Sequence, residues 1–357
     1  MESQFAIACM QTASRFIDDE ANASQIIREN VRSQLTMLSM LPQGAGPLSS
    51  YPKIIVYPEF SFQGTVTRRW TFDSWRKWLK GVAVTIPGEV SDEFGKKSAE
   101  YDMYIQGCVW EKSDAFPDHF FESVFITDPK GKVAYLRRRV ALSSNLGATT
   151  PGEIMTDYLK KHGPDPVNAL FPVLETPYGN IGGIMCGEAG IPEITRALTL
   201  NGAEIILHSN SEAWGWGNFI DGQYSWGDIW RRGRAYENMV YFASGDIGEM
   251  INCNMPRARN RGHSEVLDFR GNTMSRIDTP GEAIAGANCD IGLLRAARRD
   301  EWGPTSSCPL INAVFAPVYE SRIIWPENKK PLEADKTRQL RETVLQGLVE
   351  RKILHLS

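Results

Sequence analysis

The sequence lacks the features that identify several classes of protein. No apolar run approaches the ~20 residues that a membrane-spanning helix needs. The first ten residues, MESQFAIACM, carry no basic segment of the kind that opens a signal peptide. Lys and Arg total 39 against 43 Asp and Glu, so no excess of positive charge is present to bind nucleic-acid phosphates. We therefore expect a soluble, cytoplasmic protein that binds neither membranes nor nucleic acid.

Cysteine and histidine are too few and too scattered to indicate a metal site. The six cysteines include no CxxC pair, and the five histidines are equally dispersed. This spacing excludes the usual zinc motifs and a disulfide framework. We expect no metal ion, and we expect most of the cysteines to be reduced and buried.

The chain does contain a regular alternation of short apolar runs and longer helical patterns, which is typical of a layered α/β fold. Its 357 residues are 42% hydrophobic, enough for a substantial core. The expected strands span residues 5–10, 54–57, 103–109, 122–127, 133–138, 180–186 and 203–208, and the expected helices span residues 21–41, 91–101, 220–238 and 331–354. A further helix can start at Pro192 and stop at Gly202.

Two more strand pairs are expected towards the end of the chain, 240–243 with 265–268 and 273–277 with 284–290. The sequence has no internal repeat and no break in composition. We therefore predict one catalytic domain, residues 1–300, followed by a C-terminal extension, residues 301–357.

Cys186 lies at an expected strand-to-helix junction, in the segment NIGGIMCGEAGIPEITRAL, residues 180–198. The unpaired N–H groups and the dipole at the start of a helix stabilise a thiolate relative to a thiol. The same N–H groups can hold the oxyanion of a tetrahedral intermediate. The alternative is an ordinary buried cysteine, and this pattern alone does not decide between the two.

Glu59 follows a short buried strand in KIIVYPEFSFQG, residues 53–64. Open α/β sheets bind their ligands at the carboxyl ends of the strands. Partial burial there would raise the pKa of the carboxyl towards neutrality, as a general base for a thiol requires. The alternative is a solvated glutamate at the start of a loop.

Three adjacent arginines end the strand expected at 133–138. Alternation along a strand sends Arg137 and Arg139 to one face and Arg138 to the other. One arginine can therefore point into a site, and for two of the three we expect a solvated position.

Together, in this order, these segments resemble the nitrilase superfamily of carbon–nitrogen hydrolases. Tyr57-Pro58-Glu59 matches its hydrophobic-Pro-Glu segment, and Cys186, Pro192-Glu193 and Asn201-Gly202-Ala203 match its cysteine segment. The segment VTIPGE, residues 84–89, and the long N-terminal helix further resemble the aliphatic amidase branch. The resemblance covers roughly residues 4 to 290. It implies a four-layer α-β-β-α sandwich that dimerises through helices, with the C-terminal extension reaching a partner subunit.

Position 139 departs from this family, because Arg139 stands where relatives have lysine. In relatives the lysine is thought to help hold the developing oxyanion. Arginine keeps the positive charge and its donors but cannot supply a free amine. Three interpretations remain open: a natural variant with a shifted substrate preference, an engineered or inactivating substitution, or a homologue that has lost hydrolysis.

The resemblance also implies further site residues. Relatives use a second glutamate between positions 139 and 186, and Glu153 is our candidate because it is the only glutamate between Arg139 and Glu175. The expected substrate-binding residues are Gly187, Glu188, Asn210 and Trp214. Four tryptophans within residues 214–230 could form an aromatic pocket wall or a subunit interface. His208 is expected to be a hydrogen-bonded core residue and not a base.

The function that this resemblance implies is a cofactor-free amidase acting on a small-molecule amide or carbamoyl compound. Glu59 would take the proton from Cys186, and Arg139 with the N–H of Gly187 would hold the oxyanion. Glu59 and Glu153 would then activate water to hydrolyse the thioester. The alternatives are a nitrilase or an amine acyltransferase with the same residues, or a non-catalytic binding protein, which the replacement at position 139 motivates.

Overall fold

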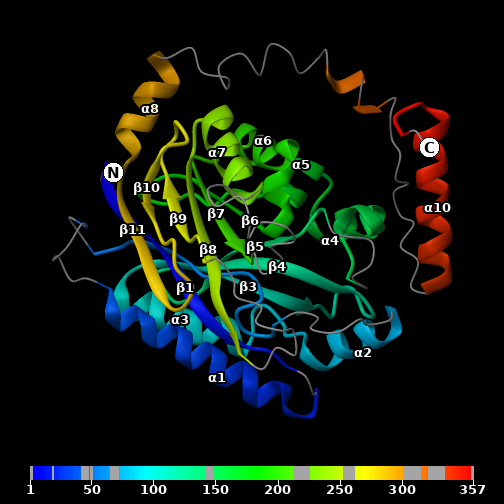
Figure 1. Ribbon diagram of the computed structural model, residues 1–357, viewed down its shortest axis with the longest axis horizontal. Coiled ribbons are helices and arrows are strands. Elements are labelled where there is room, and N and C mark those ends of the chain that lie inside the picture. Colours follow the sequence, from blue (N-terminus) through cyan, green and yellow to red (C-terminus); the bar gives the residue numbers. More distant parts are fainter. Residues whose placement is uncertain are drawn as a thin grey trace.

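The computed structural model describes residues 3–17, 20–41, 48, 51–64, 72–141, 148–211, 226–251, 262–300, 315–317, 319–320 and 334–354. Within them, two β-sheets pack face to face and helices cover the outer face of each sheet (Figure 1). No helix among these residues is both long enough and apolar enough to cross a bilayer.

The first sheet has the strand order β11-β1-β2-β3-β4-β5. Its three central strands are parallel, whereas β11, β4 and β5 each pair antiparallel with a neighbour. The bounds are β1 Gln4–Arg15, β2 Ile54–Val56, β3 Tyr104–Lys112, β4 Phe120–Thr127, β5 Val133–Arg138 and β11 Ala283–Asp290. Since β5 is separated from β3 by one antiparallel strand, β2 and β5 run in the same direction and end at the same edge.

The second sheet has the order β10-β9-β8-β7-β6, in which β6, β7 and β8 are parallel. Strand β1 joins the two sheets, because its last residues, Thr12 to Arg15, pair with β8. The bounds are β6 Ile181–Met185, β7 Ile205–Asn210, β8 Tyr241–Ile251, β9 Glu265–Leu267 and β10 Thr273–Arg276.

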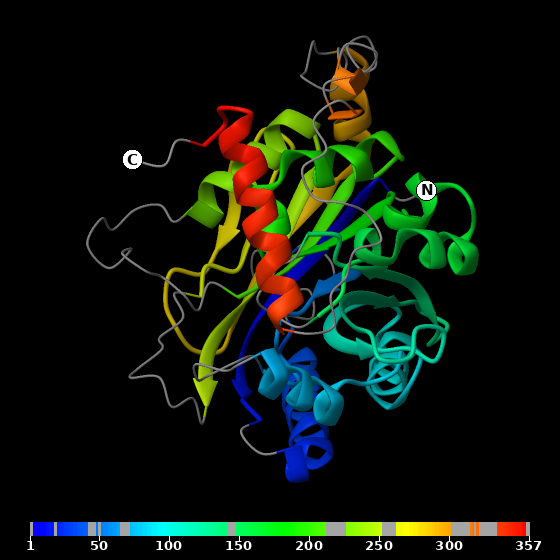
Figure 2. The same cartoon turned by 90° about the vertical axis from the view of Figure 1, so that its right-hand side faces the viewer.

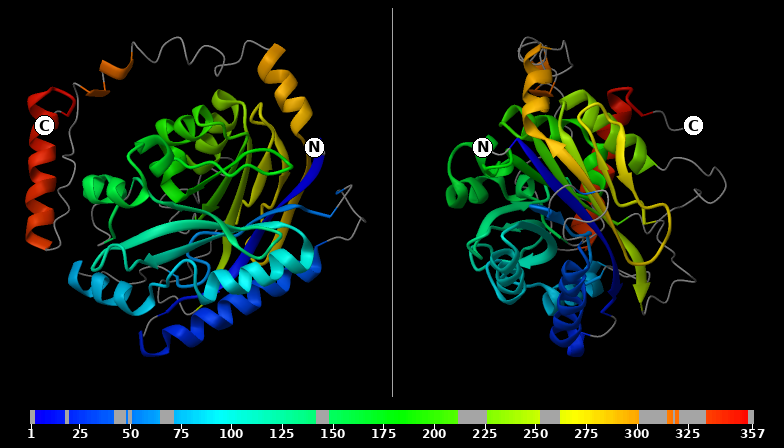
Figure 3. Two further views of the ribbon diagram at one scale, coloured as in Figure 1. Left: turned by 180° about the vertical axis from the view of Figure 1, so that it is seen from behind. Right: turned by 90° about the vertical axis from the view of Figure 1, so that its left-hand side faces the viewer.

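Helices α1 and α3 cover the first sheet, and α6 and α7 cover the second (Figures 1 and 2). Helix α10 stands apart from the sheets at the margin of the molecule, also when seen from behind in Figure 3. The bounds are α1 Ala23–Thr36, α2 Phe72–Val82, α3 Glu89–Tyr101, α4 Met155–His162, α5 Pro166–Leu170, α6 Pro192–Leu200, α7 Trp226–Asn238, α8 Ile291–Asp300 and α10 Ala334–Glu350, with 3-10 turns η1 Glu20–Asn22, η2 Met37–Met40, η3 Pro151–Ile154 and η4 Cys186–Gly190.

The alternation of side chains along the strands produces the layers. In β1, Ile7 and Cys9 face the core between the two sheets, whereas Ala8 and Met10 face the core beneath α1 and α3. In β7 the residues on either side of Ile206 face the inter-sheet core, and Ile206 itself faces α6 and α7. Three stacked cores therefore separate four layers, which confirms the expected α-β-β-α sandwich. Dimerisation through helices stays a prediction.

Of the two strand pairs expected towards the end of the chain, one forms and one does not. The expected pair 240–243 with 265–268 forms, as β8 and β9. The second expected pair is wrong, because β10 pairs with β9 and β11 pairs with β1. The reason is long-range: β11 turns Ala285, Ala287 and Cys289 into the core between the sheets, and the free edge of β1 offers it a partner there.

The long N-terminal helix consists of α1 with a 3-10 turn at each end. Helices α2, α4, α5 and α8 were not expected from the sequence. Of the helix expected at 220–238, the described part is α7. The boundary between a domain of residues 1–300 and an extension of residues 301–357 stays a prediction.

Candidate active site

The carboxyl ends of β2, β5 and β6 bring Glu59, Arg139 and Cys186 together. Arg139 Nη1 lies 3.3 Å from Glu59 Oε1, and Cys186 interacts electrostatically with both residues. Glu59 and Arg139 come from the first sheet and Cys186 from the second. The three positions therefore meet where the two sheets face each other.

Cys186 occupies a strained backbone position directly after β6. Its φ of 46° lies in the left-handed region that non-glycine residues rarely adopt. The backbone turns from the strand into η4 at this residue, so that Cys186 is partly exposed as a residue while the strand before it is fully buried. This turn presents the thiol at the end of the sheet.

His208, on β7, supports the backbone of Cys186 and not its sulfur. His208 Nε2 lies 2.9 Å from the carbonyl oxygen of Cys186, and Nδ1 lies 3.1 Å from Ser244 Oγ. A carbonyl only accepts, so Nε2 carries the proton and Nδ1 accepts from the hydroxyl. Burial lowers the pKa of His208 to about 3, so that the ring is neutral at physiological pH. It is the hydrogen-bonded core histidine that the sequence indicated.

Burial decides the proton states of Cys186 and Glu59. Removal from water raises the pKa of the Cys186 thiol, while Arg139, a hydrogen bond to Glu59 and the N–H of Gly187 lower it. Burial, Cys186 and Glu122 together raise the pKa of the Glu59 carboxyl well above its usual range. A thiol with a raised pKa therefore lies beside a carboxyl that holds its proton more strongly than an exposed glutamate does.

Backbone contacts fix Glu59. Its N–H donates to the carbonyl oxygen of Asn210 at 3.2 Å, and the Asn210 side-chain amide donates to Asp246 at 2.9 Å. Oε1 of Glu59 accepts from Arg139, and the whole Glu59 side chain is buried.

The guanidinium of Arg139 is held on two sides. Nε donates to the carbonyl oxygen of Ala141 at 2.6 Å, and Nη1 donates to Glu122 at 2.6 Å and to Glu59. Nη2 makes no hydrogen bond to a described residue. A Cβ added at Gly187 would lie 3.5 Å from Nη2, so this free donor faces the backbone next to Cys186.

Glu122, on β4, is the site residue that sequence reasoning missed. It is buried, and it contacts Arg139 through side chain and backbone, since the Arg139 N–H donates to the Glu122 carbonyl oxygen at 2.8 Å. The available signal was a carboxylate inside the apolar run FFESVFIT, because a buried charge requires a partner.

Glu153, the expected second glutamate, caps a 3-10 turn in the described part of the chain. Its Oε2 accepts from the N–H and the hydroxyl of Thr150 at 2.7 and 3.0 Å and so caps η3. The contacts of Glu59, Arg139 and Cys186 in the described part of the chain do not include it. Capping explains the contacts of Glu153 with Thr150, and its role in catalysis stays a prediction.

Glu188 has a structural position, which corrects the expectation that it binds substrate. The carboxylate is fully buried and accepts from Arg137 Nη1 and Nη2 at 2.7 and 3.0 Å. It also accepts from the N–H groups of Val140 at 2.9 Å and Met185 at 3.3 Å. Both oxygens are therefore occupied in tying η4 to the end of β5.

The expectation that two of the three arginines are solvated is wrong. Arg137, Arg138 and Arg139 are all buried, because each has a buried carboxylate partner. The alternation of faces is as expected: Arg138 points away from Cys186, pairs with Glu111 and lies 4.4 Å from the ring centre of Phe121. Trp214 lies outside the described residues.

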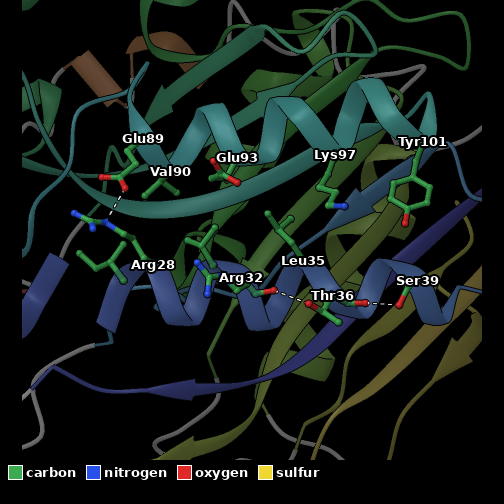
Figure 4. A pocket seen from close by; sticks show the side chains of 12 residues that line it. Arg28, Arg32, Leu35, Thr36, Ser39, Glu89, Val90, Glu93, Lys97 and Tyr101 are labelled. Carbon is green, nitrogen blue, oxygen red and sulfur yellow. Dashed lines mark hydrogen bonds and ion pairs between the residues drawn. The ribbon is translucent and has the colours of Figure 1, made fainter. Parts of the chain in front are cut away.

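The surface groove between α1 and α3 is separate from this group (Figure 4). It has a volume of about 460 Å³ and is bordered by residues of α1, η2 and α3, among them the ion pair of Arg28 and Glu89. Among the described residues, no cluster of three His, Cys, Asp or Glu side chains could hold a metal ion.

Comparison with known proteins identifies related chains. Residues 7–299 match the carbon–nitrogen hydrolase family. A Schizosaccharomyces pombe protein named probable nitrilase is 25% identical over 299 residues, which cover 82% of this chain and 92% of that protein. A Bacillus cereus formamidase is 23% identical over 229 residues, covering 63% of this chain and 59% of the relative.

A solved structure shows the same fold. It is Saccharomyces cerevisiae Nit3, a member of branch 10 of the nitrilase superfamily, with a TM-score of 0.60 at 19% identity. The superposition covers 84% of this chain and 95% of that structure.

Proposed function

Because the chain belongs to the carbon–nitrogen hydrolase family, we propose that it is an amidase that hydrolyses a small-molecule amide through a thioester on Cys186. The observation that carries this proposal is the convergence of a partly exposed cysteine, a buried carboxyl and a guanidinium whose Nη2 has no hydrogen bond to a described residue. The relatives named formamidase and nitrilase support hydrolysis of a carbon–nitrogen bond.

In the first step, the Glu59 carboxylate takes the proton of Cys186 while the sulfur attacks the amide carbon. The negative charge that develops on the amide oxygen would be held by the N–H of Gly187 and by Nη2 of Arg139. Both donors face the space beside the sulfur. Because the guanidinium is already fixed by Ala141 and Glu122, it needs no reorganisation when that charge appears.

In the second step, the carbon–nitrogen bond breaks. Glu59 returns its proton to the nitrogen, which leaves as ammonia or an amine, and the acyl group stays on the sulfur as a thioester. Water then attacks the thioester carbon. Glu59 takes a proton from that water, and the carboxylic acid leaves with the regenerated thiol. The raised pKa of Glu59 suits a group that must both accept and donate this proton.

A nitrile is the second candidate substrate class, favoured by the relative named nitrilase. Attack on a nitrile carbon would place the developing negative charge on nitrogen, which would take the proton from Glu59 to give a thioimidate. One water would then release ammonia and leave a thioester, and a second water would release the acid. The two classes differ in the geometry of the carbon under attack.

The test is ammonia release from formamide, acetamide and propionamide and from the matched nitriles, followed by intact-mass detection of an acyl adduct. We expect turnover of amides by the wild type and an adduct that maps to Cys186. Cys186→Ala should release no ammonia. Cys289→Ala, which removes a buried cysteine on β11, is the matched control and should keep wild-type activity. Turnover by Cys186→Ala would contradict the proposal.

A further inference from the structure

Glu122 and Arg139 are joined by two independent contacts across β4 and the end of β5. In this antiparallel pair Ser123 lies opposite Arg138, which places Glu122 opposite Arg139. The backbone hydrogen bond between them measures 2.8 Å, and the side-chain ion pair measures 2.6 Å. The register of the strand pair therefore sets where the carboxylate meets the guanidinium.

These contacts decide which nitrogen of Arg139 remains free. Ala141 occupies Nε, and Glu122 occupies Nη1 at a much shorter distance than Glu59 does, 2.6 Å against 3.3 Å. A planar guanidinium that is fixed at Nε and Nη1 has no rotational freedom left. Nη2 is thereby directed at the backbone of Gly187.

We infer that Glu122 is a positioning residue for Arg139. By holding Nη1 and offsetting the guanidinium charge, it aims Nη2 at the space beside Gly187, where the proposed function puts the reacting oxygen. This inference rests on the proposed function for the role of Nη2, but the orientation of the guanidinium stands without it.

The pair also affects the proton that Cys186 and Glu59 exchange. The charged or titratable groups around that proton are Glu122, Arg139, the ion pair of Arg137 with Glu188, Cys108 on β3 and the neutral His208. Glu122 is the carboxylate that raises the pKa of both Glu59 and Cys186, and Arg139 lowers both. Replacing Glu122 by glutamine removes one buried negative charge, so a proton should leave the Glu59–Cys186 pair at lower pH.

The first experiment measures the rate at which iodoacetamide alkylates Cys186 as a function of pH, with peptide mapping to assign the site. Glu122→Gln should move the profile to lower pH by about one unit, a tenfold change in proton affinity. Glu111→Gln is the matched control, because it neutralises the buried partner of Arg138 on the opposite face of β5. Its profile should coincide with that of the wild type.

The second experiment compares kcat for Glu122→Gln, Arg139→Met and the double variant, on whichever amide the wild type hydrolyses. Glu122→Gln should lower kcat about tenfold and Arg139→Met by 100-fold or more. If Glu122 acts through Arg139, the double variant should match Arg139→Met within about threefold, since contacting residues are not additive.

The inference would be overturned if the alkylation profile of Glu122→Gln coincided with that of the wild type or with that of Glu111→Gln. It would also be overturned if the fold-losses in kcat of the two single variants multiplied in the double variant. The alkylation assay needs no amide turnover. A shifted profile in a protein that hydrolyses no amide would therefore support the positioning role and refute the proposed function.

Discussion

Replacing Glu188 with alanine should destabilise the protein far more than it weakens substrate binding. The side chain is fully buried and is the ion-pair partner of Arg137, itself 1% exposed. Removing one member of a buried ion pair leaves the other charge uncompensated, which costs about 3–5 kcal/mol. The N–H groups of Val140 and Met185 also lose their acceptor, at about 1–3 kcal/mol each if they stay buried.

These losses are not additive, because water can enter the space left by the deleted carboxylate and bind some of the groups that have lost their partner. We therefore expect a loss of about 4–6 kcal/mol in the free energy of unfolding at pH 7, measured by urea denaturation. The double variant Arg137→Met with Glu188→Leu removes both charges and should recover most of this loss. Asp300→Ala, which breaks the exposed pair with Arg299, should leave the urea midpoint unchanged.

The competing interpretation makes the opposite prediction. If Glu188 contacted substrate, Glu188→Ala would raise KM while the urea midpoint stayed at the wild-type value. That pair of results would refute the reasoning about the buried ion pair.

Three further predictions follow from the site. Gly187→Ala should fold normally, since the added Cβ would lie at an ordinary contact distance of 3.5 Å from Arg139 Nη2. It should lower kcat about tenfold or more, because the methyl group fills the space for the oxyanion. Steady-state kinetics and matched thermal melts test both expectations. Arg139→Lys should lower kcat/KM about tenfold or more, because the single lysine ammonium cannot contact Ala141 and Glu122 and still offer a donor beside Gly187. A gain in activity would instead mark the arginine as inactivating. Burial lowers the pKa of His208 to about 3, whereas histidine in the unfolded chain has a pKa of about 6.5. The unfolded state therefore takes up a proton first, and stability is lost as pH falls from about 6.5 towards 3. His208→Gln should reduce the difference in unfolding free energy between pH 7 and pH 5 by about 2 kcal/mol, and an identical difference in both proteins would contradict this.

The features that sequence alone could predict are those set by local pattern. Strand β5 has the expected bounds, and the alternation of faces correctly separates Arg138 from Arg137 and Arg139. The turn that exposes Cys186 follows from its place between an apolar strand and a helix start at Pro192.

The features that were missed depend on contacts between distant segments. Nothing near position 122 in the sequence indicates an arginine 17 residues later, and the pairing of β11 with β1 joins opposite ends of the domain. Glu188 was expected to bind substrate, but its carboxylate pairs with Arg137 at the end of the neighbouring strand β5, a contact that the local sequence does not indicate.

The pairing of β1 with β11 also bears on how the protein is made. Gln4 lies opposite Asp290, so β1 leaves the ribosome long before its antiparallel neighbour β11 has been synthesised. Until then one edge of β1 offers unsatisfied backbone groups, of the kind that promote association between nascent chains. Synthesis from the N-terminal side therefore leaves the first sheet incomplete until residues 283–290 have emerged. A chain truncated before these residues would keep this edge of β1 unpaired.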